Sequence, residues 1–168
     1  MVSTPEDNFE KFYNSALRFL SYRSRSEKEV RDRLYIKYQK LNIKNLSLVI
    51  DKAIAKLKEK NFINDKEFTK WWIESRLRFK PRSFRLIKIE LKQKGINSDL
   101  IDSLIHNSQS MIQSDLEQAK KLVEKRIERF KDLPKQEVYQ KLGRFLASKG
   151  FDWDTIKKSI DEALGKVV

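Results

Sequence analysis

Apolar residues recur at spacings of three and four along most of the chain, with polar residues between them. This is the period of a helix that buries one face. Caps, prolines and glycines divide the pattern into about nine predicted helices. They cover residues 6–23, 27–39, 46–60, 65–79, 83–94, 98–107, 115–131, 134–149 and 153–165. The pattern therefore predicts an all-α protein.

Several predicted helix starts carry a small polar residue that is followed three positions later by glutamate. In such a capping box the first side chain accepts from free amides of the opening turn, and the glutamate reaches back. The predicted pairs are Ser26 with Glu29, Asn64 with Glu67, and Ser114 with Glu117. Asp152 is the predicted cap of the last helix.

One helical pattern occurs three times: a helix that ends in arginine, a second helix, and in two copies a glycine with a short third helix. Gly95 and Gly150 are 55 residues apart, and each follows a lysine where a chain leaving a helix needs positive φ. Tyr38 stands near the glycine position of the first copy, so we expect that helix to end differently. We predict three-helix repeats at 1–62, 63–107 and 108–168, in an elongated, curved array.

Composition limits the classes of function. The 168 residues contain no cysteine, which excludes disulfides and thiolate metal sites, and His106 is the only histidine. We interpret His106 as a solvent-facing or capping residue and expect no metal, cofactor or enzyme activity. No apolar run approaches the roughly 20 residues of a membrane span, and the N-terminus lacks a secretory pattern, so we expect a cytoplasmic protein with no membrane partner.

Charge points to a polyanionic partner. The 37 Lys and Arg against 24 Asp and Glu give a net charge of +13. Eight basic residues lie between positions 76 and 94 with a single acid, Glu90. These are Arg76, Arg78, Lys80, Arg82, Arg85, Lys88, Lys92 and Lys94. Arg23 and Arg25 begin a weaker cluster in the first repeat, which acidic residues dilute.

The central cluster allows two interpretations. Three of its residues, Arg85, Lys88 and Lys92, fall within about 60° on one helix and form a basic stripe, and a basic loop precedes that helix. The cluster could be a solvated face. Because neighbouring cations without acidic partners at i+4 repel one another, we favour a site for phosphate or carboxylate groups. Trp71 and Trp72 point about 100° apart, and we assign them to the core and an inter-repeat contact rather than to base stacking.

Three segments resemble the signatures of the RecX family of regulatory proteins. The first is Ala16–Leu34. The second combines 62–68, 72–76 and 89–96, and the third is Phe145–Phe151 with Ile156. The resemblance extends from about Phe12 over nearly the whole chain.

The resemblance implies tandem three-helix repeats and a modulator of the RecA recombinase. Members of the family are understood to bind in the groove of the RecA filament on single-stranded DNA and to oppose its extension, ATP hydrolysis and strand exchange. That role belongs to DNA repair, homologous recombination and the SOS response. We expect a monomer that contacts the filament, with single- or double-stranded DNA nearby, through the ten basic residues named above.

The sequence leaves two alternatives open. A helix pair of this kind also resembles a helix-turn-helix, so the chain could bind DNA without a recombinase. The basic stripe carries no Asn or Gln, however, and is better suited to charge than to base edges. A nucleic-acid-processing enzyme is a remoter alternative, because no nucleophile and base pair is evident.

Overall fold

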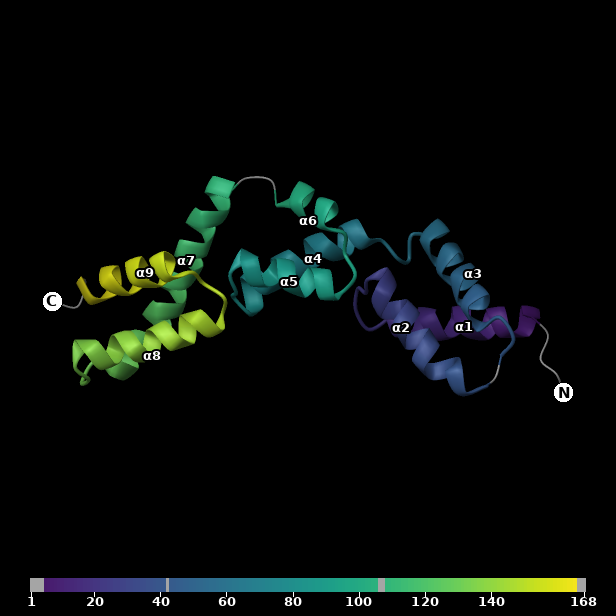
Figure 1. The fold of residues 1–168 in the computed structure, drawn as a ribbon, viewed down its shortest axis with the longest axis horizontal. Coiled ribbons are helices and arrows are strands. Elements are labelled where there is room, and N and C mark those ends of the chain that lie inside the picture. The colour runs from purple at the N-terminus through teal and green to yellow at the C-terminus, as the bar shows by residue number, and fades with distance from the viewer. Residues whose placement is uncertain (1–4, 42, 106–107, 166–168) are drawn as a thin grey trace. The chain divides into compact units, whose positions relative to one another are not determined.

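The structure is a computed structural model that describes residues 5–41, 43–105 and 108–165. These residues form helices joined by short turns and contain no β-strand (Figure 1). The all-α prediction is confirmed. The interpretation of His106 falls outside the described residues.

The first repeat contains α1 (Pro5–Leu20), α2 (Glu27–Tyr38) and α3 (Leu46–Glu59). Their apolar faces enclose a core that includes Phe12, Val30, Leu34 and Ile50. Tyr38 completes this core, because its ring stacks on Phe12 with centroids 4.1 Å apart. At this position, where the other repeats have glycine, the chain continues into the short 3₁₀ turn η1 (Gln39–Leu41). The expected difference at the end of the helix is therefore confirmed.

The second repeat contains α4 (Asp65–Phe79), α5 (Phe84–Gln93) and α6 (Ser98–Leu104). The third contains α7 (Ser108–Ile127), the turn η2 (Glu128–Phe130), α8 (Lys135–Ser148) and α9 (Trp153–Gly165). In Figure 1 the last three helices, green to yellow, pack against one another. Val123, Leu142, Leu146 and Ile160 lie in their core.

The predicted caps have different outcomes. Ser26 and Glu29 form the complete capping box, and Asp152 accepts the Thr155 amide at 2.9 Å. The Asn64 side chain accepts two amides of the first turn of α4. The prediction for Ser114 is wrong, because α7 begins at Ser108 and Ser114 lies inside it. Nothing in a capping pattern prevents a helix from extending through it when the preceding residues also favour a helix.

The chain packs into two compact units, and the second repeat contributes to both. One unit holds residues up to Trp71 together with Leu91–Leu100, and the other holds Trp72–Glu90 and the residues from Ile101 onward. The repeat boundaries 62/63 and 107/108 stay a prediction.

Within the first unit, the start of α2 is attached to the turn that follows α5. The Ser26 hydroxyl caps α2 and donates 2.7 Å to the Lys94 carbonyl, and the Glu27 amide donates 2.8 Å to Asp65. Gly95 has φ +80°, and a Cβ there would lie 2.7 Å from the Lys28 Cβ. We call this arrangement the first joint.

A similar second joint lies within the other unit. Its serine and glycine are 57 and 55 residues further along the chain than those of the first joint, and its aspartate is 50 residues further. The Ser83 hydroxyl caps α5 and donates 2.6 Å to the Gly150 carbonyl, and the Phe84 amide donates 3.0 Å to Asp115. Gly150 has φ +86°, and a Cβ there would lie 2.7 Å from Ser83 Oγ. Both joints therefore need a serine cap, an aspartate acceptor and a glycine.

The aspartate of the second joint should make folding pH-dependent. Burial, with a contribution from Asp152, raises the Asp115 pKa from 3.8 to about 6, although the Phe84 amide opposes this shift. The stability that this raised pKa contributes is complete below pH 4 and is lost as the pH rises through about 6. We expect D115N, which keeps an acceptor for Phe84, to become more stable than the parent by about 1–3 kcal/mol above pH 7.

Urea unfolding of both proteins from pH 4.5 to 7.5 measures this difference. The advantage of D115N should grow with pH and level off above pH 7. A difference that does not change with pH would show that Asp115 does not titrate in this range in the folded protein.

Candidate functional site

The carboxylate of Glu90 on α5 forms ion pairs with two of the predicted site arginines. It accepts from Arg76 Nε at 2.6 Å, from Trp72 Nε1 at 2.9 Å and from Arg82. The guanidinium of Arg76 also lies 4.0 Å from the centre of the Trp72 ring. Trp72 is buried, as one of the two tryptophans was expected to be, whereas Trp71 is 36% exposed.

Three more predicted site residues are paired with acids, which lie 6 to 65 residues away in the sequence. Lys88 bonds to Asp102 at 2.7 Å, and Lys94 and Arg23 both bond to Glu29, at 2.7 and 2.9 Å. Burial raises the pKa of Glu29, but these two cations and the Ser26 amide hold it at about 2. The assumption that the central cluster lacks acidic partners is therefore wrong for Lys88 and Lys94, because i+4 spacing tests only a helix's own face.

Arg25 lies against an aromatic ring rather than an acid. Its guanidinium is 4.1 Å from the centre of the Phe19 ring, and its Nε is buried without a hydrogen-bond partner among the described residues. Burial, followed by the charge of Arg23, lowers its pKa. Arg25 is thus partly packed into the first repeat.

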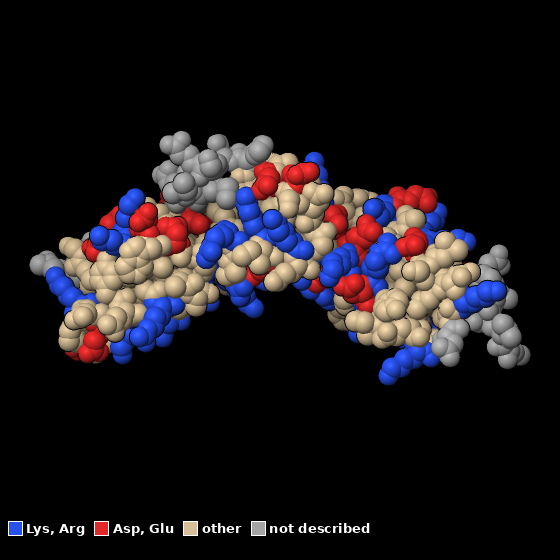
Figure 2. Space-filling model, viewed as in Figure 1, with Lys and Arg blue, Asp and Glu red and all other residues tan. Residues whose placement is uncertain are grey.

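The remaining four predicted cations are exposed and have no carboxylate partner in the described part of the chain. They are Arg78, Lys80, Arg85 and Lys92. In Figure 2 basic side chains gather over α5 near the centre of the view, whereas basic and acidic side chains are mixed over α2. These four residues are the part of the predicted cluster that is available to an anion.

The loop between α4 and α5 forms one wall of a hollow of about 540 Å³, which we call the basic hollow. Its position is set by the second joint, where the Ser83 amide also donates 3.0 Å to the Lys149 carbonyl. The hollow is lined by Phe79, Lys80, Pro81, Arg82, Leu122, Lys125, Arg126, Phe145 and Lys149. It thus has five cationic side chains and no acidic one.

Sequence reasoning missed three of these cations, Lys125, Arg126 and Lys149. The guanidinium of Arg126 lies 3.7 Å from the centre of the Phe145 ring, and the Lys149 ammonium lies 5.6 Å from it. A signal was present in Lys149, which precedes Gly150 as Lys94 precedes Gly95. Arg126 also carried a signal, because it is the arginine that ends the first helix of the third copy, whereas neighbouring acids in the sequence hide Lys125.

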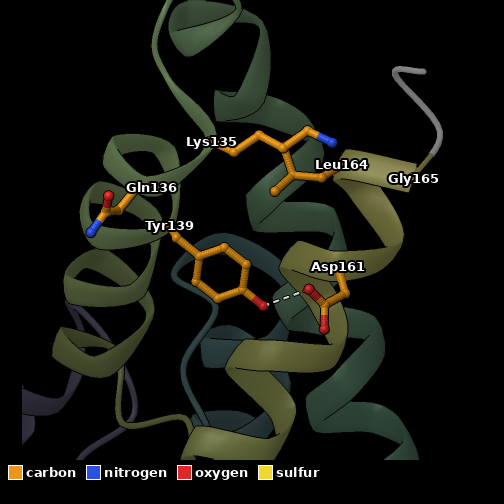
Figure 3. A pocket seen from close by; sticks show the side chains of 6 residues that line it. All are labelled: Lys135, Gln136, Tyr139, Asp161, Leu164 and Gly165. Carbon is orange, nitrogen blue, oxygen red and sulfur yellow. Dashed lines mark hydrogen bonds between the residues drawn. The ribbon is translucent and has the colours of Figure 1, made fainter.

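A second hollow, between α8 and α9, is chemically different (Figure 3). There the Tyr139 hydroxyl donates 2.6 Å to Asp161. Burial and then this carboxylate raise the Tyr139 pKa to about 12. The bond braces the two helices, and the carboxylate makes this hollow a poor place for an anion.

No group of three His, Cys, Asp or Glu residues is placed to hold a metal ion in the described ranges. No helix among those residues is both long and apolar enough to cross a bilayer.

The three-helix domains of the RecX family match the chain in order. The first domain matches residues 13–41, the second 64–105 and the third 113–160. The regulatory protein RecX of Clostridium tetani is 33% identical over 168 residues, which cover 97% of this chain and 72% of the relative. The chain belongs to the RecX family.

Other RecX relatives agree. The RecX proteins of Bacillus velezensis and Clostridium perfringens are 33% and 38% identical over 93% and 89% of this chain. The chain spans 56% and 66% of their lengths. The crystal structure of RecX from Lactobacillus salivarius has a TM-score of 0.72 at 28% identity, covering 94% of this chain and 97% of that one. These RecX comparisons confirm the family and the three-helix repeats.

Proposed function

We propose that the chain binds the filament formed by a RecA recombinase on single-stranded DNA and opposes its extension, ATP hydrolysis and strand exchange. Membership of the RecX family supports a regulatory role, since the relatives are named regulatory proteins. The observation that supports the contact with the filament is a set of four exposed cations that have no carboxylate partner among the described residues: Arg78, Lys80, Arg85 and Lys92. Such a role in DNA repair would place the protein in the cytoplasm.

Charge explains how this surface would act. Cations that have no acidic neighbour can release the counterions of a polyanion when they bind it, so affinity falls with salt. The four residues lie at the end of α4, in the loop and on α5. They offer charge without the amide side chains that read base edges. The contact should therefore be insensitive to DNA sequence.

The first test follows ATP hydrolysis by the cognate recombinase on single-stranded DNA while this protein is titrated. We expect hydrolysis to fall at stoichiometric or lower amounts, because a bound regulator opposes filament extension. Unchanged or faster hydrolysis at stoichiometric amounts would contradict the proposed negative regulation. DNA binding without any effect on hydrolysis would favour the alternative of a DNA-binding protein that acts without a recombinase.

The second test removes the four exposed cations together as R78A, K80A, R85A and K92A. Arg82 stays, because it is part of the Glu90 network. We expect weaker filament binding, by tenfold or more, and a flatter salt dependence at unchanged helical content. The matched control replaces Lys52, Lys60, Lys66 and Lys157, which are exposed and carry the same charge. If the two variants bind the filament with the same affinity and salt dependence, the cluster is only a solvated face.

A further inference from the structure

We propose that the basic hollow holds a segment of single-stranded nucleic acid, with phosphates against the cations of α7 and of the turn after α8, and one base against Phe79. The inference deepens the proposed function and rests on it for the biological context, because it names where and how a strand is contacted. The relevant cations are Lys125 and Arg126 near the end of α7, and Lys149 after α8.

The charge of the basic hollow favours an anionic ligand. Five cationic groups line about 540 Å³, and no carboxylate does. Arg82 is paired with Glu90, which lies outside the lining, so four of the five cations are left for a ligand. Lys125, Arg126 and Lys149 have no carboxylate partner in the described residues, so their mutual repulsion is not relieved inside the chain. Packing on Phe145 fixes two of them, Arg126 and Lys149, facing the same ring. An anion that bridges these groups would relieve the repulsion.

An exposed aromatic ring at the basic hollow favours a ligand that contains bases. Phe79 is the last residue of α4 and is 70% exposed, although it lines the hollow. The Arg78 guanidinium lies 5.2 Å from the centre of its ring. A phenylalanine exposed to this extent beside cations is a platform on which a base can stack, and such stacking tolerates any base.

These two features together favour a single strand over the other polyanions. In a duplex the bases are already stacked on one another, so the ring of Phe79 could not cover a base face. An acidic peptide would use the cations but gain nothing specific from the ring. A single strand supplies phosphates at short intervals and unstacked bases between them.

The test is fluorescence anisotropy of a labelled oligothymidylate with the full chain. F79L keeps an apolar side chain and removes the ring. We expect it to weaken binding by about fivefold to a hundredfold without changing the salt slope. K125Q, R126Q and K149Q combined should weaken binding and flatten the salt slope by about two. Because Phe79 is exposed, F79L tests the proposal even where the triple variant folds poorly.

The control replaces Lys121, Lys157 and Lys158 with glutamine, which removes the same charge from exposed positions outside the hollow. Its affinity should exceed that of the hollow variant at least tenfold. Unchanged binding by F79L, or equal binding by the two triple variants, overturns the proposal. Displacement of the oligonucleotide by polyglutamate as readily as by unlabelled strand would also overturn it, in favour of an acidic peptide.

The same variants separate this inference from the proposed function. Strand binding that depends on the hollow, with no effect of the protein on recombinase ATP hydrolysis, sustains the inference and contradicts the proposed function. Inhibition of the recombinase, with strand binding that ignores the hollow, sustains the function and contradicts the inference.

Discussion

G150A should lose about 3 kcal/mol of unfolding free energy, the largest effect that we expect from adding a single methyl group to this chain. Alanine at φ +86° is strained, at roughly 1–2 kcal/mol. The added Cβ would also lie 2.7 Å from Ser83 Oγ and 2.8 Å from Leu86 Cβ. The second joint must therefore open, and the wall of the basic hollow should move with it. Urea unfolding and oligonucleotide binding measure the two effects.

Gly143 provides the matched control for G150A, because it lies in α8, the helix that precedes Gly150. It lies inside α8, and a Cβ there would meet only Ile156 Cγ2, at 4.0 Å. G143A should stabilise the protein by about 0.5–1 kcal/mol, because alanine favours the helix. G150N separates strain from collision, since asparagine tolerates positive φ but carries the same Cβ. If G150N unfolds with the same free energy as the parent, the collision of a Cβ at position 150 with Ser83 and Leu86 does not destabilise the protein.

E90Q should have opposite effects on stability and on anion binding. The Glu90 side chain is only 12% exposed and holds Arg76 and Arg82. Breaking a largely buried ion pair costs about 3–5 kcal/mol, and partial exposure here reduces the expected loss to about 2–3 kcal/mol. Because Arg82 also lines the basic hollow, its release should strengthen oligonucleotide binding by about threefold to tenfold.

E74Q is the control, since Glu74 is exposed on α4 and the substitution changes net charge equally. Thermal unfolding and anisotropy at two salt concentrations would compare the two variants. If E90Q and E74Q bind with equal affinity, Arg82 makes no contact with the strand. If they unfold at the same temperature, the Glu90 network does not stabilise the fold.

Much of the helical structure could be predicted because its signals are local. The predicted limits 65–79 and 153–165 coincide with α4 and α9. The 57-residue spacing of Ser26 and Ser83 matches that of Leu34 and Leu91, so it could have revealed the joints. The start of α7 was missed, because a capping pattern shows where a helix can begin and not where it must.

The sequence by itself determined the helices, their repetition, the two glycines at positive φ and the excess of positive charge. These follow from periodicity, caps and composition, which depend on residues close together in the chain. Only the tertiary structure decided which cations are neutralised, because the partners of Lys94 and Lys88 lie 65 and 14 residues away. It also brought Lys125, Arg126 and Lys149 beside the central loop, since the second joint ties that loop to the turn after α8.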